Sequence, residues 1–266
     1  MSPDDFAATR AALVAARRDA QRIAECPAAW RPADLPEAYR LQAAVAGELG
    51  AIGGWKVGAL TAEQRRTMGV AVPVGAPLPL ATMHDASKFA ARLFLGRFIE
   101  PRIECEFAFQ LGADLPARPA PYARAEVQAA VAALRIAIEI VDPRLPRGSG
   151  TLAEIADGFN NGGFVAGPST LDWQAIAFAT TQIVLVHVDA NGRCSELARG
   201  NGGAILDGNP FAAVVLLANA QPDAARGLRA GDIVTTGSCT GAPRVPGPGD
   251  YRADFAGIGS IALSFA

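Results

Sequence analysis

Two acidic residues stand in an apolar run, Pro-Arg-Ile-Glu-Cys-Glu-Phe-Ala-Phe, that is typical of a β-strand. Glu104 and Glu106 are two residues apart, so a strand directs both side chains to the same face. We expect Cys105 to point toward the core on the opposite face. Burial of a carboxylate costs several kcal/mol unless a cation or hydrogen-bond donors replace its hydration. A divalent metal ion is the simplest compensation.

A third acid, Glu139, lies in residues 134–141, another run that indicates a buried strand. Three carboxylates form a hard, oxygen-only ligand set, which suits Mg²⁺ or Mn²⁺, whereas Zn²⁺ recruits Cys or His. The alternative is that each glutamate pairs with an arginine, and Arg102 and Arg135 are the candidates. Spacing alone gives the two interpretations about equal weight.

Lys56 stands out because the chain contains two lysines against 22 arginines. It lies in a short, glycine-flanked apolar strand at residues 54–58. Because desolvation lowers the pKa of a lysine toward the working pH, such a residue can act as acid, base or charge stabiliser. The alternative is an ion pair at the end of a strand.

Composition limits the class of protein. The 266 residues suffice for one large domain or one and a half, and half of them are hydrophobic. A net charge of −2 without a basic block argues against a nucleic-acid or membrane partner. The first residues carry acids where a secretory signal would carry Lys or Arg, which predicts a cytoplasmic protein. The four cysteines are far apart, so we expect free thiols.

Hydrophobic periodicity predicts how these residues are positioned. Helices are expected at residues 3–23, 35–49, 61–68, 123–133 and 210–220. Strands are expected at 101–111, 134–142, 162–167, 181–190, 193–200, 231–237 and 258–265, with a hairpin at Asp189-Ala190-Asn191-Gly192. Residues 70–80 indicate a loop or hinge, so we divide the chain into an N-terminal helical part (1–75) and a metal-binding β domain (76–266). His187 is interpreted as structural.

Several motifs follow one another along the chain. They are Gly-Trp-Lys-Val-Gly (54–58), Pro-Arg-Ile-Glu-Cys-Glu (101–106), Ala-Ile-Glu-Ile-Val-Asp (137–142), residues 156–167, and Leu-Arg-Ala-Gly-Asp-Ile-Val (228–234) followed by Thr-Gly-Ser (236–238). This ordered set resembles the 2-keto-4-pentenoate hydratase and 4-oxalocrotonate decarboxylase family of the fumarylacetoacetate hydrolase superfamily. The resemblance covers nearly the whole chain and implies an α+β fold, a small N-terminal helical part plus a mixed β-sandwich roll. It also implies Mg²⁺ or Mn²⁺ held by Glu104, Glu106 and Glu139.

The resemblance implies a substrate as well, a 2-oxo or 2-hydroxydienoic acid whose carboxylate and 2-oxygen chelate the metal. In this hypothesis 2-hydroxypenta-2,4-dienoate ketonises and takes up water to give 4-hydroxy-2-oxopentanoate in aromatic-compound catabolism. Lys56 would move protons. Relatives of this kind are commonly homo-oligomers, so we expect one here.

The sequence departs from the family pattern at two places. Relatives carry an acid before the proline where this chain has Ala-Val-Pro-Val (71–74), so a candidate proton-transfer carboxylate is missing. Relatives have small hydroxyl residues where this chain has residues 158–163, and Asn160 lies near a position that can touch the substrate. The alternatives in order are 4-oxalocrotonate decarboxylase, an acylpyruvate C–C hydrolase, and a non-catalytic metal-dependent binding subunit.

Overall fold

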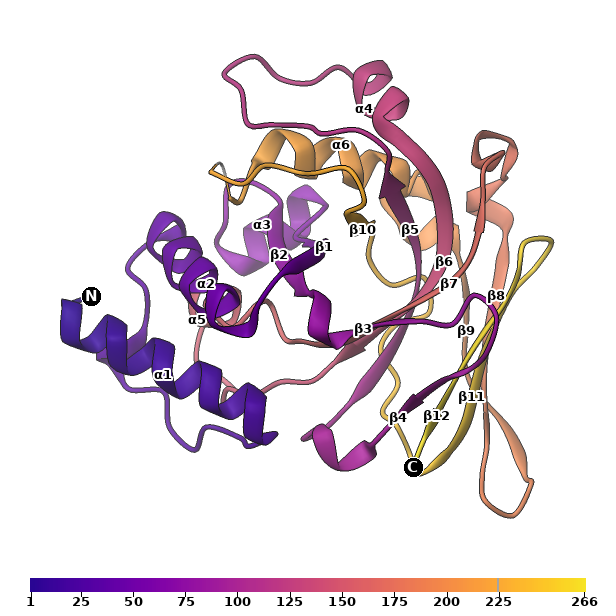
Figure 1. The fold of residues 1–266 in the computed structure, drawn as a ribbon, viewed down its shortest axis with the longest axis horizontal. Helices are drawn as coiled ribbons and strands as arrows, with labels where there is room; N and C mark the ends of the chain where they lie inside the picture. Colours follow the sequence, from indigo (N-terminus) through magenta and orange to yellow (C-terminus); the bar gives the residue numbers. More distant parts are fainter. Residues whose placement is uncertain (224) are drawn as a thin grey trace.

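The structure is a computed structural model that describes residues 1–223 and 225–266. In this part of the chain helices precede and interrupt two β-sheets (Figure 1). The α-helices are α1 (Pro3–Asp19), α2 (Leu35–Leu49), α3 (Ala62–Met68), α4 (Arg124–Ala130), α5 (Thr151–Ala156) and α6 (Phe211–Ala220). The strands are β1 (Ile52–Gly58), β2 (Val74–Pro79), β3 (Met83–Asp85), β4 (Ala91–Leu93), β5 (Arg102–Leu111), β6 (Val131–Val141), β7 (Asn161–Thr170), β8 (Gln182–Val188), β9 (Cys194–Asn201), β10 (Ile233–Thr235), β11 (Gly249–Phe255) and β12 (Gly259–Phe265).

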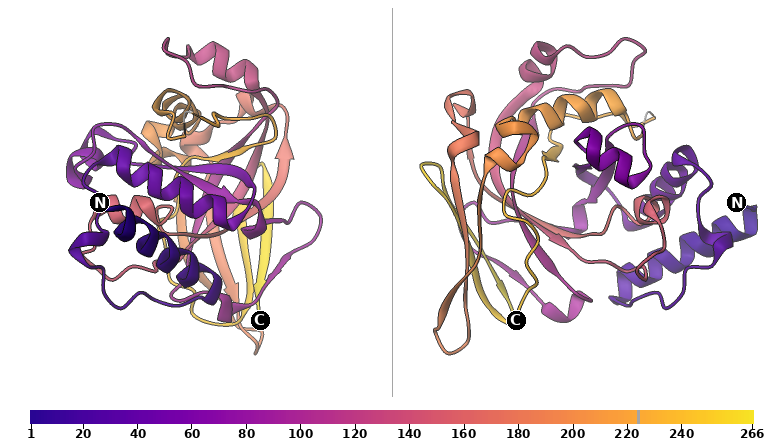
Figure 2. Two further views of the ribbon diagram at one scale, coloured as in Figure 1. Left: turned by 60° about the vertical axis from the view of Figure 1, so that its left-hand side comes forward. Right: turned by 180° about the vertical axis from the view of Figure 1, so that it is seen from behind.

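The strands form two mixed sheets. The larger has the order β2-β1-β10-β5-β6-β7-β3, and the smaller has the order β4-β12-β11-β8-β9. Most neighbours are antiparallel, while β1 with β10, β3 with β7 and β4 with β12 are parallel. Both sheets curl, and Figure 2 shows the smaller one packed against the outer face of the curved strands of the larger. The predicted α+β class with a mixed β-roll is confirmed.

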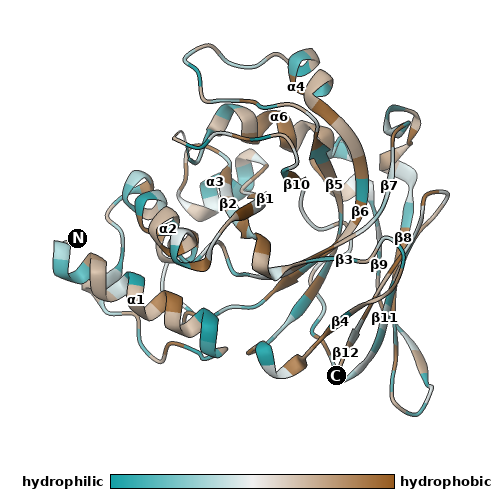
Figure 3. Cartoon of the chain, in the orientation of Figure 1, coloured by the Kyte–Doolittle hydropathy of each residue, from teal (hydrophilic) through white to brown (hydrophobic). Residues whose placement is uncertain are grey.

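The main core lies between the two sheets. Along β5, the odd-numbered residues from Ile103 to Phe109 belong to this core, and the even-numbered residues face the other way. Cys105 is 0% exposed in that core, as expected. Hydrophobic colouring follows β5, β6 and α6 in Figure 3, in keeping with their burial. Among the described residues, no helix combines the length and apolar character needed to span a bilayer.

The N-terminal helices form a layer on the side of the larger sheet away from the smaller one (Figures 1 and 2). The Ser2 hydroxyl caps α1 by accepting from the Asp5 amide, and acidic residues in its first turn and basic residues in its last suit the helix dipole. Leu13 of α1 and Leu41 of α2 pack together with Ala156 of α5. The predicted helical layer is confirmed, although α1 ends at Asp19 rather than residue 23.

The prediction of a loop or hinge at residues 70–80 is wrong for its second half. Residues 74–79 form β2, which pairs antiparallel with β1 along the whole of that strand. β2 is an edge strand, where prolines such as Pro77 and Pro79 are tolerated because one side needs no ladder hydrogen bonds. Both β1 and β2 therefore belong to the larger sheet, and the division of the chain near residue 75 stays a prediction.

The predicted hairpin is confirmed by the antiparallel pairing of β8 with β9. Gly192 has a φ of +77°, which the turn requires, and the Asp189 carboxylate accepts from the amides of Asn191 and Arg193. His187, in β8, stacks on Tyr251 with ring centroids 4.5 Å apart. Its structural interpretation agrees with this packing.

Candidate metal and substrate site

Three glutamates from two neighbouring strands meet on one face of the larger sheet. In the register of β5 and β6, Glu104 lies directly opposite Glu139, and Glu106 follows two residues along β5. A carboxylate oxygen from each lies within 4.8 Å of those of the other two. Glu106 and Glu139 are 1% and 0% exposed, and Glu104 is half-buried. The structure thus brings together the three acids selected from the sequence.

The alternative of arginine pairing is wrong. Arg102 and Arg135 donate to backbone carbonyls and, for Arg135, to side chains outside the triad. The cation at the triad is Lys56 of β1, whose Nζ lies 2.5 Å from Oε1 of Glu139. The ion pair considered for Lys56 is therefore present. One ammonium faces three carboxylates, so the described side chains leave negative charge in excess.

The hydrogen bonds of the triad are incomplete. Oε2 of Glu106 accepts from the amides of Thr236 and Gly237, at 3.0 and 2.8 Å. Oε1 of Glu139 accepts from Nδ2 of Asn161 at 3.2 Å, in addition to Lys56. Its other oxygen, Oε2, is buried and has no hydrogen-bond partner among the described residues. Buried carboxylate oxygens without a partner are rare in folded proteins, and an ion is one established reason for them.

Electrostatics lead to the same conclusion. Burial, followed by the charge of Glu139, raises the pKa of Glu104 to about 7, while Lys56 acts in the opposite direction. Burial, then Glu139 and Glu104, raises the pKa of Glu106 well above its usual value. A cation at the triad would stabilise the ionised carboxylates and lower these pKa values. The oxygen-only donor set and the unpaired oxygen of Glu139 fit a hard divalent ion such as Mg²⁺ or Mn²⁺.

Lys56 differs from the sequence expectation in its charge state. Burial by itself lowers the pKa of this lysine, but the charges of Glu139, Glu104 and Glu106 outweigh it, and the pKa is raised. The direction of this shift is opposite to the one that burial alone would give. Lys56 is an ammonium, which suits a proton donor or charge stabiliser better than a base.

The triad opens into a cavity of about 360 Å³. Its base is acidic, and its walls combine apolar side chains with the polar side chains of Thr61, Gln64, Asn160 and Ser238. The acids that line it are the three glutamates, and residues 71–74 are not among its lining, so no fourth carboxylate replaces the missing one in the described cavity. The lining comprises residues 56–61, Gln64, Met68, Glu104, Glu106, Glu139, Val141, Phe159, Asn160, residues 204–206, Gly237 and Ser238.

A turn with unusual backbone geometry forms one wall of the cavity. Gly158, Phe159 and Asn160 have φ angles of +64°, +53° and +60°, all in the left-handed region. For a non-glycine residue this costs on the order of 1–3 kcal/mol, and asparagine tolerates it better than phenylalanine does. The Phe159 carbonyl accepts from Nζ of Lys56 at 3.0 Å. Asn160 lines the same cavity as the triad, and its contact with a substrate stays a prediction.

Sequence reasoning assigned no role to several contacts. The Asn161 amide and the Phe159 carbonyl come from residues 158–163, where the Gly-Phe-Asn-Asn-Gly-Gly run indicated a turn but not its contacts. The amides of Thr236 and Gly237 could not be found from side-chain chemistry, because the backbone makes the contact.

Solved structures share the fold. The 4-oxalocrotonate decarboxylase from Pseudomonas putida G7, complexed with magnesium and adipate, matches all of this chain and 99% of its own with a TM-score of 0.84 and 21% identity. The fumarylpyruvate hydrolase from Pseudomonas aeruginosa, in complex with Mn²⁺ and pyruvate, matches 80% of this chain and 88% of its own with a TM-score of 0.55 and 16% identity. The fold is therefore of the fumarylacetoacetate hydrolase type.

No protein-family model matches the chain. The 2-keto-4-pentenoate hydratase of Paraburkholderia phymatum is 31% identical over 279 residues, covering 100% of both chains. The 2-keto-4-pentenoate hydratase 2 of Dechloromonas aromatica is 30% identical over 272 residues, covering 100% of this chain and 98% of its own. A 4-oxalocrotonate decarboxylase of Pseudomonas sp. is 30% identical over 171 residues, 64% of this chain and 62% of its own. The chain belongs to the 2-keto-4-pentenoate hydratase family, and the resemblance found in the motifs is confirmed.

Proposed function

We propose that this protein is a metal-dependent hydro-lyase that adds water to 2-hydroxypenta-2,4-dienoate and forms 4-hydroxy-2-oxopentanoate. Hydratases of this name align with the chain from end to end. The observation that carries the proposal is a buried ammonium, Lys56, held against a carboxylate triad at the base of a cavity. This arrangement places a proton donor beside a site for a divalent ion.

Glu104, Glu106 and Glu139 would hold Mg²⁺ or Mn²⁺. When bound, such an ion supplies Lewis acidity and an orienting contact for the oxygens of a 2-oxo acid. The amides of Thr236 and Gly237 orient the Glu106 carboxylate for this task.

Lys56 is the side chain that we assign to proton movement. The reaction takes a proton from the 2-hydroxyl group and delivers one to C5, after which water supplies a hydroxyl to C4 and a proton to C3. Two of the three Nζ–H bonds of Lys56 point to Glu139 and to the Phe159 carbonyl, which leaves one for the substrate. The Asn160 amide, in the cavity wall, can donate a further hydrogen bond to a substrate oxygen.

The apolar part of the cavity lining favours a substrate with an uncharged tail. Leu60, Met68 and Ile205 contribute to this wall, and Lys56 is the cationic side chain among the lining residues. A second carboxylate placed against these three apolar side chains would lose its hydration without gaining a cation. This favours the dienoate over the dicarboxylate 4-oxalocrotonate.

The test is the ultraviolet absorbance of 2-hydroxypenta-2,4-dienoate, generated in situ, with purified protein and Mg²⁺ or Mn²⁺. We expect metal-dependent loss of the dienol signal, 4-hydroxy-2-oxopentanoate as the product, and no reaction with the Glu106→Gln variant. Glu196→Gln, at an exposed ion pair with Arg199, serves as the matched control and should remain active. Loss of signal without this product would contradict the proposal.

The second candidate is decarboxylation of 4-oxalocrotonate. A relative that aligns with part of the chain and a solved structure that aligns with all of it are both 4-oxalocrotonate decarboxylases. In addition, residues 71–74 lack a carboxylate that could serve in proton transfer during hydration. Release of CO₂ from 4-oxalocrotonate, with the dienoate unchanged, would identify it.

Two further alternatives have less support. Acylpyruvate hydrolysis through a His–Glu pair is disfavoured because neither His84 nor His187 lines the cavity. A non-catalytic binding subunit is disfavoured because the triad and Lys56 are assembled together. A cytoplasmic location and a homo-oligomeric assembly stay predictions.

A further inference from the structure

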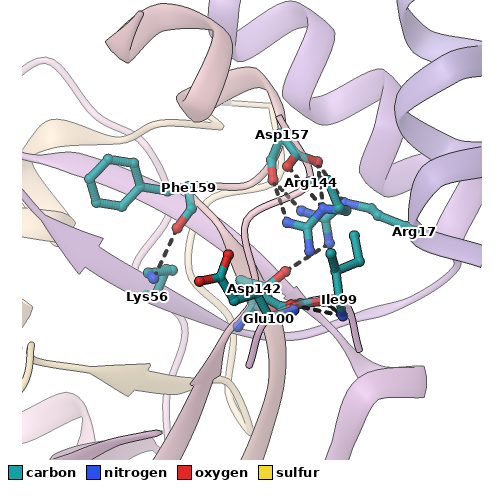
Figure 4. Close-up of polar contacts among 9 residues, drawn as sticks. Arg17, Lys56, Ile99, Glu100, Asp142, Arg144, Asp157 and Phe159 are labelled. Carbon is teal, nitrogen blue, oxygen red and sulfur yellow. Dashed lines mark hydrogen bonds and ion pairs between the residues drawn. The ribbon is translucent and has the colours of Figure 1, made fainter. Parts of the chain in front are cut away.

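A second cluster of buried charge lies behind the cavity wall and does not reach the cavity. Asp157, which is 0% exposed, accepts from two arginines (Figure 4). Nε of Arg17 lies 3.1 Å from its Oδ1, and Nε of Arg144 lies 2.9 Å from its Oδ2. Both guanidinium groups also donate to the Asp157 carbonyl. The start of the turn at residues 157–161 is thereby fixed to helix α1 and to the segment after β6.

Arg17 makes a hydrogen bond to the far end of the turn that Arg144 does not make. Its Nη1 donates to the carbonyl of Asn161 at 3.1 Å, so a single side chain from α1 holds both ends of the turn. The guanidinium also packs directly on the backbone between them, because a Cβ built at Gly158 would lie 2.5 Å from Nη2. Glycine at that position allows the close approach.

The turn that Arg17 spans is the one in the left-handed conformation. Phe159 and Asn160 adopt positive φ angles that such residues leave unless their surroundings fix them. The Asn160 carbonyl accepts from the Asp142 amide at 2.8 Å, and the Phe159 amide donates to the Glu154 carbonyl at 2.8 Å. Arg17 adds the contact that closes the turn from the helical layer.

Two contacts connect the turn to the functional site, one to Lys56 and one to Glu139. The Phe159 carbonyl accepts from Lys56, and the Asn161 amide donates to the same Glu139 oxygen that pairs with Lys56. In Figure 4 the Phe159 carbonyl points toward Lys56 on one side of the turn, and Arg17 approaches Asp157 from the other. A change in the turn would therefore alter the orientation of the ammonium and of the carboxylate together.

We propose that Arg17 is a positioning residue for catalysis, which holds the turn at residues 157–161 so that its carbonyl and amide orient Lys56 and Glu139. Helix α1 thus does more than cover the sheet, because it supplies the residue that shapes the reacting end of the cavity. The inference rests on the proposed function for its kinetic effect, while the orientation of Lys56 can be measured without any substrate.

The kinetic test compares Arg17→Ala and Arg17→Lys with Arg10→Ala, a control on the same helix whose side chain is 41% exposed. For Arg17→Ala we expect kcat to fall about 10- to 100-fold, as for other residues that orient a catalytic group, with KM changed less than about 3-fold. Arg17→Lys should recover part of kcat, because an ammonium can bind one end of the turn. It lacks the planar, multi-donor geometry of a guanidinium that binds both ends. Added guanidinium ion should raise kcat of Arg17→Ala.

The second readout uses the fact that Lys56 and Lys88 are the lysines of the sequence. In protein labelled with ¹⁵N-lysine and carrying Lys88→Arg, the remaining side-chain ammonium signal belongs to Lys56. The protons of a buried, hydrogen-bonded ammonium exchange slowly with water, so protein that retains Arg17 should give a sharp Lys56 signal. Arg17→Ala should shift and broaden it, and Arg10→Ala should leave it unchanged.

The two readouts separate the possible results. If no substrate reacts with the wild type, the proposed function fails, and the Lys56 signal alone decides the role of Arg17. An Arg17→Ala variant that is less stable to heat but keeps kcat and the Lys56 signal would overturn the inference. If Arg17→Ala does not fold, Arg17→Gln, which adds no further lysine, decides, and a wild-type kcat with an unchanged signal would overturn the inference.

Discussion

The two clusters of buried charge on either side of the turn at residues 157–161 are built in opposite ways. Around Asp157, two guanidinium groups satisfy both oxygens of one carboxylate. At the triad, a single ammonium faces three carboxylates, and Oε2 of Glu139 has no partner among the described residues. The first cluster is complete within the chain, whereas the second needs a further cation.

This difference suggests that the cluster around Asp157 stabilises the fold, whereas the glutamate triad serves function. Burial, followed by the charge of Arg144, lowers the pKa of Arg17 to about 10, and Asp157 acts against this shift, so Arg17 stays charged at neutral pH. A cluster with its hydrogen bonds satisfied in this way fixes helix α1 to the turn before β7. Carboxylates whose pKa values are raised instead indicate a site that gains stability when a ligand binds.

The largest effect on turnover is expected when one of the three glutamates that would bind the metal is replaced. Glu106→Gln should lower metal-dependent turnover more than about 100-fold, because loss of a direct ligand exceeds the effect of losing a residue that only orients one. The measurement is kcat with saturating Mg²⁺, alongside Mg²⁺ binding by calorimetry. A variant that binds Mg²⁺ as tightly as wild type would contradict the assignment of Glu106.

Lys56→Met separates proton movement from metal binding. Turnover should fall about 10²- to 10⁴-fold because the proton donor is lost. Mg²⁺ affinity should be kept or increased, since the variant removes a positive charge beside the ion. Steady-state kinetics and calorimetry on the same preparation give the two values. Full activity of Lys56→Met would show that another group moves the protons.

Asp157→Asn tests the complete cluster. It should lower the free energy of unfolding by about 3–5 kcal/mol, because it leaves Arg17 and Arg144 buried without their counter-ion. Urea unfolding in the presence of EDTA measures this change. In the same assay Glu106→Gln should not destabilise, since it removes a carboxylate whose ionised form is disfavoured by burial and by neighbouring acids. Equal losses in both variants would remove the distinction between the clusters.

The smallest effect concerns pH. The pKa of Glu104 is raised to about 7 by burial and by Glu139, above the usual 4.5. Between these values the folded chain binds more protons at this group than the unfolded chain, so its contribution to stability falls as pH rises. In EDTA, the wild type should lose more stability between pH 5 and pH 8, about the window set by that shift, than Glu104→Gln does. Parallel pH profiles would contradict this contribution.

How far the site could be predicted from sequence depends on the distance of each contact along the chain. The spacing of Glu104 and Glu106 follows from the strand period alone. Their meeting with Glu139 depends on the register of β5 with β6, which the sequence of neither strand sets by itself. Lys56 reaches the triad through strand β1, so its Glu139 contact also required the assembled sheet.

The errors in the fold have similar causes. β2 was missed because its prolines and glycine are typical of a loop, although an edge strand tolerates them. β11 was missed although its alternation of polar and apolar residues is typical of a strand. The helix predicted to residue 133 ends at Ala130, because pairing with β5 extends β6 back to Val131 despite the helical preference of alanine. Local propensity gave way to sheet pairing in both regions.

The most direct test is the rate of 4-hydroxy-2-oxopentanoate formation from 2-hydroxypenta-2,4-dienoate as a function of free Mg²⁺ concentration. The account predicts no turnover in EDTA and saturable recovery, with a midpoint that matches the dissociation constant from calorimetry and is lost in Glu106→Gln. Turnover at the full rate in EDTA, or recovery unaffected by Glu106→Gln, would contradict the claim that the incomplete acidic cluster is a metal-dependent hydratase site.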